Sequence, residues 1–191
     1  MRLGLMVLGI ASALFASGSN GPATLLVDDF SRDGISTLGQ TWQTFTDRVM
    51  GGLSEGRAGF ETLDGKRCLR LQGNVSLENQ GGFVQAALPL AKGGGSFDAS
   101  GFKGVRIWVR GNGAAYYLHL RTADSRLPWQ YYAAGFEAGR TWQQVDIPFS
   151  DFKPENLSNA LDKRSMKRLA IVAAKRAFTA DVAVARIEFY E

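Results

Sequence analysis

Short segments in which apolar and polar residues alternate run through most of the chain. Turn-forming Gly, Asp and Asn residues separate these segments, and the chain has 23 glycines but only 5 prolines. Alternation places the apolar side chains on one face of a β-strand, and many short strands between tight turns are typical of sandwiches and barrels. The pattern therefore predicts an all-β fold.

The predicted strands are Thr24–Phe30, Trp42–Thr46, Gly59–Leu63, Arg67–Gln72, Gly82–Leu88, Val105–Arg110, Ala115–Arg121, Gln130–Gly135, Gln143–Pro148, Arg168–Ala173 and Val182–Tyr190. The glycine-rich run 92–96 and the stretch 154–165 are predicted surface connections, the second with a short helix near 159–164. No βαβ alternation and no internal repeat interrupts this series. We therefore expect a jelly-roll β-sandwich of two antiparallel sheets.

One pair of predicted strands has a clear turn between them. Val105–Arg110 and Ala115–Arg121 are joined through Gly111-Asn112-Gly113. Both glycines and the asparagine tolerate the positive φ angles that a tight turn requires. We expect the two strands to pair as an antiparallel hairpin.

The first residues have the pattern of a secretory signal. Arg2 precedes the apolar stretch Leu3–Phe15, which is followed by small residues. This stretch is shorter than the roughly 20 apolar residues of a membrane-spanning helix, so stable membrane insertion is not expected. Residues 1–18 are predicted to be a signal peptide, with cleavage as late as residue 23, and residues 24–191 to be one domain. The domain is expected to be exported to the periplasm or the extracellular space, and an uncleaved leader that tethers it to a membrane is the alternative.

Several kinds of site are excluded by residue counts. Cys68 is the only cysteine and His119 the only histidine, which excludes an intramolecular disulfide, a cysteine-built metal site and a multi-histidine site within one chain. No Walker loop or Gly-x-Gly-x-x-Gly fingerprint occurs, so no cofactor is expected. Asp28, Asp29 and Glu188 are the calcium candidates, because jelly rolls often bring their first and last strands together.

The alternation also predicts a binding surface. Val105, Ile107 and Val109 should face the core, so their neighbours on that strand face outward. If the hairpin forms, the outward residues of both strands share one surface. Its candidate binding residues are Arg106, Trp108, Tyr117, His119, Arg121, Trp129 and Tyr131. Aromatic rings beside cationic donors suit sugars, peptides or anionic groups, and the alternative is that these residues pack beneath long loops.

The formal net charge of +4 is a modest excess. A basic stretch contributes to it through Lys163, Arg164, Lys167, Arg168, Lys175 and Arg176. This stretch lacks the interleaved aromatic residues that stack on bases, so a nucleic-acid partner is not expected. The stretch is interpreted as a solvated face or as a site for an anionic partner.

Two segments carry a resemblance to a known family. They are W-Q-T-F-T-D-R-V-M-G-G-L-S at 42–54 and N-V-S-L-E-N-Q-G-G-F at 74–83. With later pieces such as W-Q-Q-V-D-I-P-F at 142–149, they make the chain similar to the complex I intermediate-associated protein 30 family. The resemblance implies a galactose-binding-like β-sandwich and, in eukaryotic members, a mitochondrial chaperone role in the assembly of respiratory complex I.

The family's motif residues fall here on Trp42, Asp47, Arg48, Met50, Gly51, Gly52, Ser54, Asn79, Gly81, Gly82 and Phe83. Two interpretations of this motif remain open. In the first, the glycines permit a sharp strand crossing while Asp47, Arg48, Ser54 and Asn79 form hydrogen bonds that lock two loops together. In the second, the motif is a ligand site.

The leading hypothesis for function is a noncatalytic binding or assembly protein that engages a protein partner through a sheet face or a loop. The first alternative is a carbohydrate-binding module, because the aromatic residues can stack on sugar rings. The second is a carboxylate-based enzyme acting on glycans, since glycoside hydrolysis needs two suitably separated carboxylates. Its candidates are Glu78, Glu137, Asp146 and Asp151. The oligomeric state is not predicted.

Overall fold

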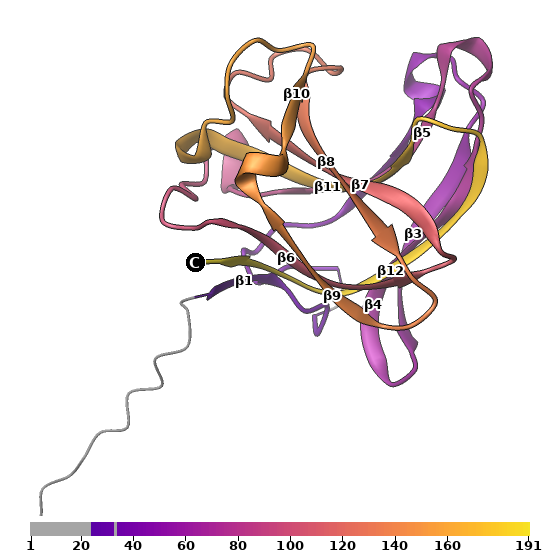
Figure 1. Ribbon diagram of the computed structural model, residues 1–191, viewed down its shortest axis with the longest axis horizontal. Helices are drawn as coiled ribbons and strands as arrows, with labels where there is room; N and C mark the ends of the chain where they lie inside the picture. Colours follow the sequence, from indigo (N-terminus) through magenta and orange to yellow (C-terminus); the bar gives the residue numbers. More distant parts are fainter. Residues whose placement is uncertain (1–23, 33) are drawn as a thin grey trace, which may run out of the picture.

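Two antiparallel sheets of six strands pack face to face in the computed structural model, which describes residues 24–32 and 34–191 (Figure 1). The predicted all-β jelly-roll sandwich is confirmed. The predicted signal peptide lies outside the described residues. No helix in the described part of the chain is long and apolar enough to cross a membrane.

The first sheet has the order β3-β4-β12-β6-β9, with β1 also paired to β12. Its strands are β1 (Thr24–Asp28), β3 (Glu55–Leu63), β4 (Lys66–Val75), β6 (Gly104–Gly111), β9 (Gln143–Pro148) and β12 (Phe178–Tyr190). The second sheet has the order β10-β8-β7-β11-β5-β2. Its strands are β2 (Gln43–Thr46), β5 (Phe83–Pro89), β7 (Ala114–Thr122), β8 (Tyr131–Ala138), β10 (Lys153–Glu155) and β11 (Met166–Ala174).

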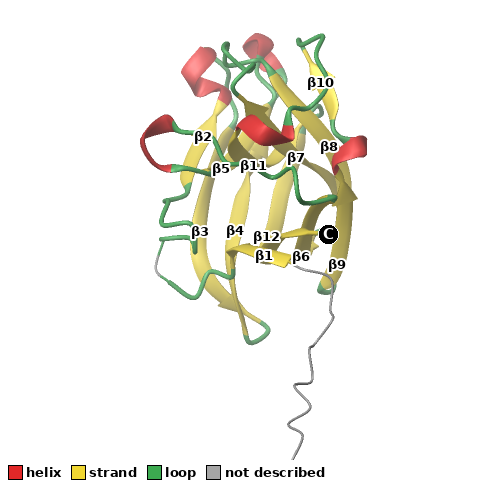
Figure 2. Cartoon of the chain, turned by 90° about the vertical axis from the view of Figure 1, so that its left-hand side faces the viewer, coloured by secondary structure: helices red, strands yellow, loops and turns green. Residues whose placement is uncertain are grey.

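Short 3₁₀ turns make up the remaining regular structure, and they lie in the half of the molecule that holds the second sheet (Figure 2). They are η1 (Asp47–Met50), η2 (Glu78–Gln80), η3 (Lys92–Gly94), η4 (Phe149–Asp151) and η5 (Lys163–Ser165). Every predicted strand overlaps an observed one. The three-residue strand β10 was not predicted, and the predicted helix near 159–164 is only the single turn η5.

The core fills the space between the sheets. Inward residues of β6 and β7 are fully buried: Val105, Ile107, Val109, Tyr116, Leu118 and Leu120 each have an exposed fraction of 0%. They belong to one apolar cluster that also includes inward residues of β5, β8, β11 and β12. Burial of this apolar area is the main stabilising contribution to the fold, because the described chain has no disulfide.

The predicted hairpin is wrong. β6 pairs with β12 and β9 in the first sheet, whereas β7 pairs with β11 and β8 in the second. The turn Gly111-Asn112-Gly113 therefore carries the chain from one sheet to the other. Residues that tolerate positive φ, such as Gly113 at 84°, serve this crossing as well as they would serve a hairpin.

Hydrogen bonds hold the crossing in place. The Asn112 side chain accepts from the Tyr116 hydroxyl at 2.8 Å and donates to the Thr179 carbonyl at 2.8 Å. The Tyr116 hydroxyl in turn accepts from the backbone N–H of Asp181 at 2.8 Å. Tyr116 lies on β7 and Asp181 on β12, so this network joins the two sheets.

We predict that Tyr116→Phe lowers the free energy of unfolding by about 1–3 kcal/mol, because the N–H of Asp181 loses its buried acceptor while the ring still fills its place. Urea denaturation of both proteins measures the difference. Tyr117→Phe is the matched control, since the ring of Tyr117 faces outward on the next position of β7. An equal loss in both variants would contradict the role assigned to the Tyr116 hydroxyl.

Candidate functional site

The predicted binding residues do not share one surface. Arg106 and Trp108 point outward from β6 of the first sheet, while Tyr117, His119 and Arg121 point outward from β7 of the second. Tyr131 lies on β8 beside them, and Trp129 lies in the loop between β7 and β8 with half of its surface exposed. The single surface expected from the hairpin is therefore wrong, because the sandwich separates the two sets.

Ion pairs occupy the outward face of the first sheet. Arg106 donates two hydrogen bonds to Asp146, at 2.7 and 2.6 Å. Arg70 donates twice to Asp181 at 2.7 Å and once to Glu61 at 2.9 Å. Further pairs join Arg110 to Asp64 and Arg186 to Glu188. Each arginine in these ion pairs is thus paired with a carboxylate of the same sheet or of its turns.

The calcium candidates do not form a site. The Asp28 carboxylate accepts from the Trp42 indole N–H at 2.8 Å and from the Phe30 backbone at 2.8 Å. Asp29 accepts from Ser31 at 2.6 Å, and Glu188 accepts from Arg186 at 2.7 Å. Within residues 24–32 and 34–191, no group of three or more His, Cys, Asp or Glu side chains could hold a metal ion.

The second sheet carries a different set of outward residues. We call Tyr117, His119, Arg121, Tyr131 and Arg168 the aromatic face. These residues come from the neighbouring strands β7, β8 and β11, and Figure 1 shows this sheet curving from β10 toward β5. They bring two phenol rings, an imidazole and two guanidinium groups onto one surface.

A row of small residues crosses the middle of this face. His119 pairs in register with Ala133 on one side and with Ala170 on the other, and Ala170 pairs with Ala87. The three alanines are buried although they point away from the core. The flanking rows carry the longer side chains of Tyr117 and Arg121, so the alanine row is recessed between them.

His119 is the most unusual group on the aromatic face. Its ring stacks on Tyr131 at 4.0 Å between centroids with an interplanar angle of 12°, and only 9% of its surface is exposed. Its Nε2 is buried and has no hydrogen-bond partner in the described structure. Burial lowers the pKa of His119 to about 3, with a smaller contribution from the charge of Lys175. The imidazole is therefore neutral at pH 7, and its Nε2 is a buried hydrogen-bonding atom left unpaired.

An ion pair spans the aromatic face. Lys175, just after β11, bonds through Nζ to Glu155 of β10 at 2.6 Å, and the same Nζ lies 5.0 Å from the centre of the Tyr117 ring. The order of strands places β7 and β8 between these two residues. Their side chains are 45% and 36% exposed, and such exposed pairs contribute only about 0–1 kcal/mol. A ligand can therefore displace this pair at little cost.

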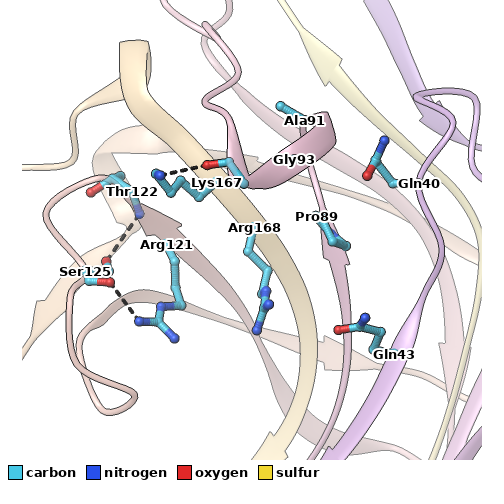
Figure 3. Close-up of a pocket in the computed structure, with 11 residues that line it drawn as sticks. Gln40, Gln43, Pro89, Ala91, Gly93, Arg121, Thr122, Ser125, Lys167 and Arg168 are labelled. Atoms are coloured by element: carbon cyan, nitrogen blue, oxygen red, sulfur yellow. Dashed lines mark hydrogen bonds between the residues drawn. The ribbon is translucent and has the colours of Figure 1, made fainter.

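A hollow of about 470 Å³ adjoins the aromatic face, and we call it the basic hollow (Figure 3). Arg121 and Arg168 belong both to the face and to its wall. Arg121 Nη2 donates to the carbonyls of Ser125 at 2.7 Å and Leu127 at 2.9 Å, which ties it to the loop that contains Trp129. The Arg168 guanidinium lies 5.6 Å from the centre of the Phe45 ring.

The family motif forms a second feature, in which one buried carboxylate joins two loops. Asp47 is fully buried and accepts from the backbone N–H groups of Ser54 at 2.9 Å, Gly82 at 2.5 Å and Phe83 at 3.2 Å. It also accepts from the Ser54 hydroxyl. Burial alone would raise the pKa of Asp47, but these hydrogen bonds outweigh it and hold the pKa below its usual value.

The motif glycines fit around this carboxylate. A Cβ atom on Gly52 or on Gly81 would collide with the Asp47 side chain, so only glycine allows the two loops to approach so closely. Arg48 bonds to Glu55 at the surface, and Asn79 contributes a backbone conformation with φ at 54°. The contacts of Asp47 and Ser54 are therefore those expected from the first interpretation of the motif, in which hydrogen bonds lock the two loops together.

The locked loops present exposed apolar side chains to solvent. We call the group Val49, Met50, Leu53 and Leu77 the loop tip. Their exposed fractions are 71%, 52%, 47% and 52%. Apolar side chains of this size are rarely left exposed together without a partner surface, so the loop tip is a second candidate for binding.

The carboxylates considered for catalysis are dispersed over the fold. Asp146 is held by Arg106 on the first sheet, Glu137 lies on β8 of the second, and Asp151 and Glu78 lie in η4 and η2. Neither the basic hollow nor a second hollow of about 710 Å³ beside η4 has Asp or Glu among its described lining residues. This arrangement offers no acid pair in the hollows for glycoside hydrolysis.

Comparison with solved structures defines the class of fold. The chain is similar to the family 11 carbohydrate-binding module of the cellulase Lic26A-Cel5E of Clostridium thermocellum, with a TM-score of 0.70, 12% identity, and coverage of 89% of this chain and 95% of that one. The same module solved with a β-1,3-1,4-mixed-linked tetrasaccharide gives a TM-score of 0.69 at 13% identity, covering 89% and 96% of the two chains. A family 30 carbohydrate-binding module gives 0.62 at 16% identity, covering 88% of each chain. The fold is thus a jelly-roll β-sandwich of the kind found in these carbohydrate-binding modules.

The family follows from the sequence profile of complex I intermediate-associated protein 30, which matches residues 29–178. This protein belongs to that family. No curated protein sequence matches the chain.

We predict that Asp47→Asn lowers the free energy of unfolding by about 2–4 kcal/mol at pH 7, because backbone donors lose a charged acceptor. The folded pKa of Asp47 lies below the unfolded value of about 3.9, so its stabilisation is complete above that pH and is lost as pH falls through the folded pKa. Urea denaturation of both proteins between pH 7 and pH 2 should therefore show the difference shrinking in acid. A difference that stays constant with pH would contradict the charged role of Asp47.

Proposed function

We propose that this protein is a noncatalytic binding module that acts after export and binds a glycan on the aromatic face. The observation that carries the proposal is His119 Nε2, a buried hydrogen-bonding atom without a partner, on an outward face between Tyr117 and Tyr131. A buried polar atom left unpaired costs stability, and a ligand hydroxyl would satisfy it when binding moves the side chains that cover Nε2.

The chemistry of the face suits sugars. Rings of Tyr117 and Tyr131 provide flat apolar contact, and Trp129 adds a half-exposed ring in the adjoining loop. Arg121 and the neutral His119 supply hydrogen-bonding groups in fixed positions between strands of a rigid sheet. Flat rings with a few fixed polar groups are the usual composition of small-ligand sites.

The contrast between the two outward faces supports the same choice. Ion pairs within the first sheet occupy Arg70, Arg106 and Arg110. The aromatic face instead keeps Arg121 and Arg168 without a carboxylate partner among the described residues. The second sheet is therefore the one whose outward arginines are available to bind a ligand.

Tyr131→Ala is predicted to weaken glycan binding at least about 10-fold, because an aromatic contact and the support of the His119 ring are both lost. A glycan array identifies ligands of the wild-type protein, and isothermal titration calorimetry measures the affinity of each variant. Trp108→Ala is the matched control, since it removes an outward aromatic ring from the other sheet and should leave affinity unchanged. An array without any bound glycan, or equal losses in both variants, would refute this function.

A second candidate function is docking of a protein through the loop tip, as the family description suggests. Its specific observation is the exposure of four apolar side chains on loops that Asp47 holds rigid. A rigid apolar projection loses little conformational entropy when a partner covers it.

Met50→Ser is predicted to abolish capture of a protein partner if the loop tip docks it. A photo-crosslinking residue placed at Val49 in the full-length protein identifies the captured subunit in the native host. The same probe at Leu127, which is also exposed but lies in the β7–β8 loop, is the control. Equal capture from both positions, or capture that survives Met50→Ser, would rule out docking at the loop tip.

A further inference from the structure

Two arginines lie directly opposite each other in the wall of the basic hollow. Arg121 of β7 and Arg168 of β11 are register partners, and both are half-buried. Like charges directly opposite in a sheet destabilise the pairing of the strands. Such a local conflict in an otherwise consistent fold is typical of a functional site.

A β-bulge adds a third cation at the same place. The register between β11 and β7 shifts between Met166 and Arg168, so Lys167 is the extra residue. Bulges redirect side chains, and here Lys167 and Arg168 both line the hollow although they are consecutive residues (Figure 3). The Lys167 ammonium donates to the carbonyl of Gly94 at 2.8 Å, which fixes its position.

Among the described residues, no Asp or Glu lines the hollow beside these cations. The hollow is lined by Gln40, Gln43, Pro89, Ala91, Gly93, Gly94, Arg121, Thr122, Ser125, Lys167 and Arg168. In the part of the chain that the structure describes, no carboxylate forms an ion pair with Arg121, Lys167 or Arg168. Arg121 satisfies only one guanidinium nitrogen with the loop carbonyls, so donors remain for a ligand.

We propose that the basic hollow binds the anionic group, a carboxylate or a sulfate, of an acidic glycan whose sugar rings lie on the aromatic face. This inference rests on the proposed function and specifies its ligand class. A guanidinium binds either anion through two parallel hydrogen bonds, and an anion between Arg121 and Arg168 relieves their repulsion. His119 is the outward residue of β7 that immediately precedes Arg121 on this face, so one oligosaccharide can contact both.

The test compares polysaccharides that differ in charge. Affinity electrophoresis in gels that contain polygalacturonate, a sulfated galactan or neutral mixed-linked β-glucan gives the dissociation constant for each, at an ionic strength of about 0.15 M. We expect the wild-type protein to bind at least one acidic polymer at least about 10-fold more tightly than the neutral one. Preference for one acidic polymer identifies the anionic group.

Three variants test whether the preference for an acidic polymer depends on the basic hollow. Arg168→Gln should reduce binding of the acidic polymer about 10-fold and reduce binding of the neutral polymer much less, so that the ratio of the two dissociation constants moves toward one. Arg168→Glu should abolish binding of the acidic polymer, and its melting temperature should not fall because it places a carboxylate opposite Arg121. Arg57→Gln is the control, since it removes the same charge from an exposed position on β3 of the first sheet.

The outcomes distinguish failure of the anionic site from failure of glycan binding. Equal binding of acidic and neutral polymers, or equal losses in Arg57→Gln and Arg168→Gln, would overturn the anionic site while leaving glycan binding intact. Failure of every polysaccharide to bind would overturn the proposed function together with this inference.

Discussion

The hydrogen bonds around Asn112 determine which side chains of this protein share a surface. They fix the crossing at which the chain leaves β6 in one sheet and enters β7 in the other. A Cβ atom on Gly111 would contact Ala138 and the carbonyl of Asp181, so the crossing is also tight. Because two adjacent stretches of sequence are divided in this way, Arg106 and Arg121 project from opposite sides of the sandwich.

This division gives the two outward faces different electrostatic roles. On the first sheet, Arg106 lies opposite Asp146 in the register of β6 and β9, so the cross-strand pair stabilises the sheet. On the second sheet, Arg121 lies opposite Arg168, and the same geometry is unfavourable. The first arrangement needs nothing from outside the molecule, whereas the second becomes favourable only when an anion is present. Electrostatics therefore distinguishes the two outward faces, and this difference supports the proposal that the second face binds a ligand.

The strands and the inward residues of the core were predictable from alternation, because a period of two is a local property of the chain. Membership of a sheet is not local, so the surface combining Trp108 with Tyr117 was wrong although each strand was right. Tyr117, His119, Arg121 and Tyr131 do lie together, since β7 and β8 are true neighbours. The position of Arg168 opposite Arg121 was hidden within a basic stretch, because neither its partner strand nor the bulge at Lys167 can be read from the sequence. The contacts between Asp47 and Ser54 were more accessible, since the family resemblance singled out both loops and hydrogen bonds that lock them were one of the two interpretations left open.

Burial disfavours the charged form of both His119 and Arg121 at the candidate site, but only the imidazole loses its charge at neutral pH. With its pKa lowered to about 3, His119 stays neutral over the whole physiological range. Burial and the charge of Arg168 lower the pKa of Arg121 as well, but a guanidinium begins so far above neutral pH that it remains protonated. A buried imidazole that resists protonation can sit beside two cations without adding to their repulsion. The sole histidine therefore suits a position next to Arg121, where a lysine would intensify the charge conflict and an acid would neutralise it.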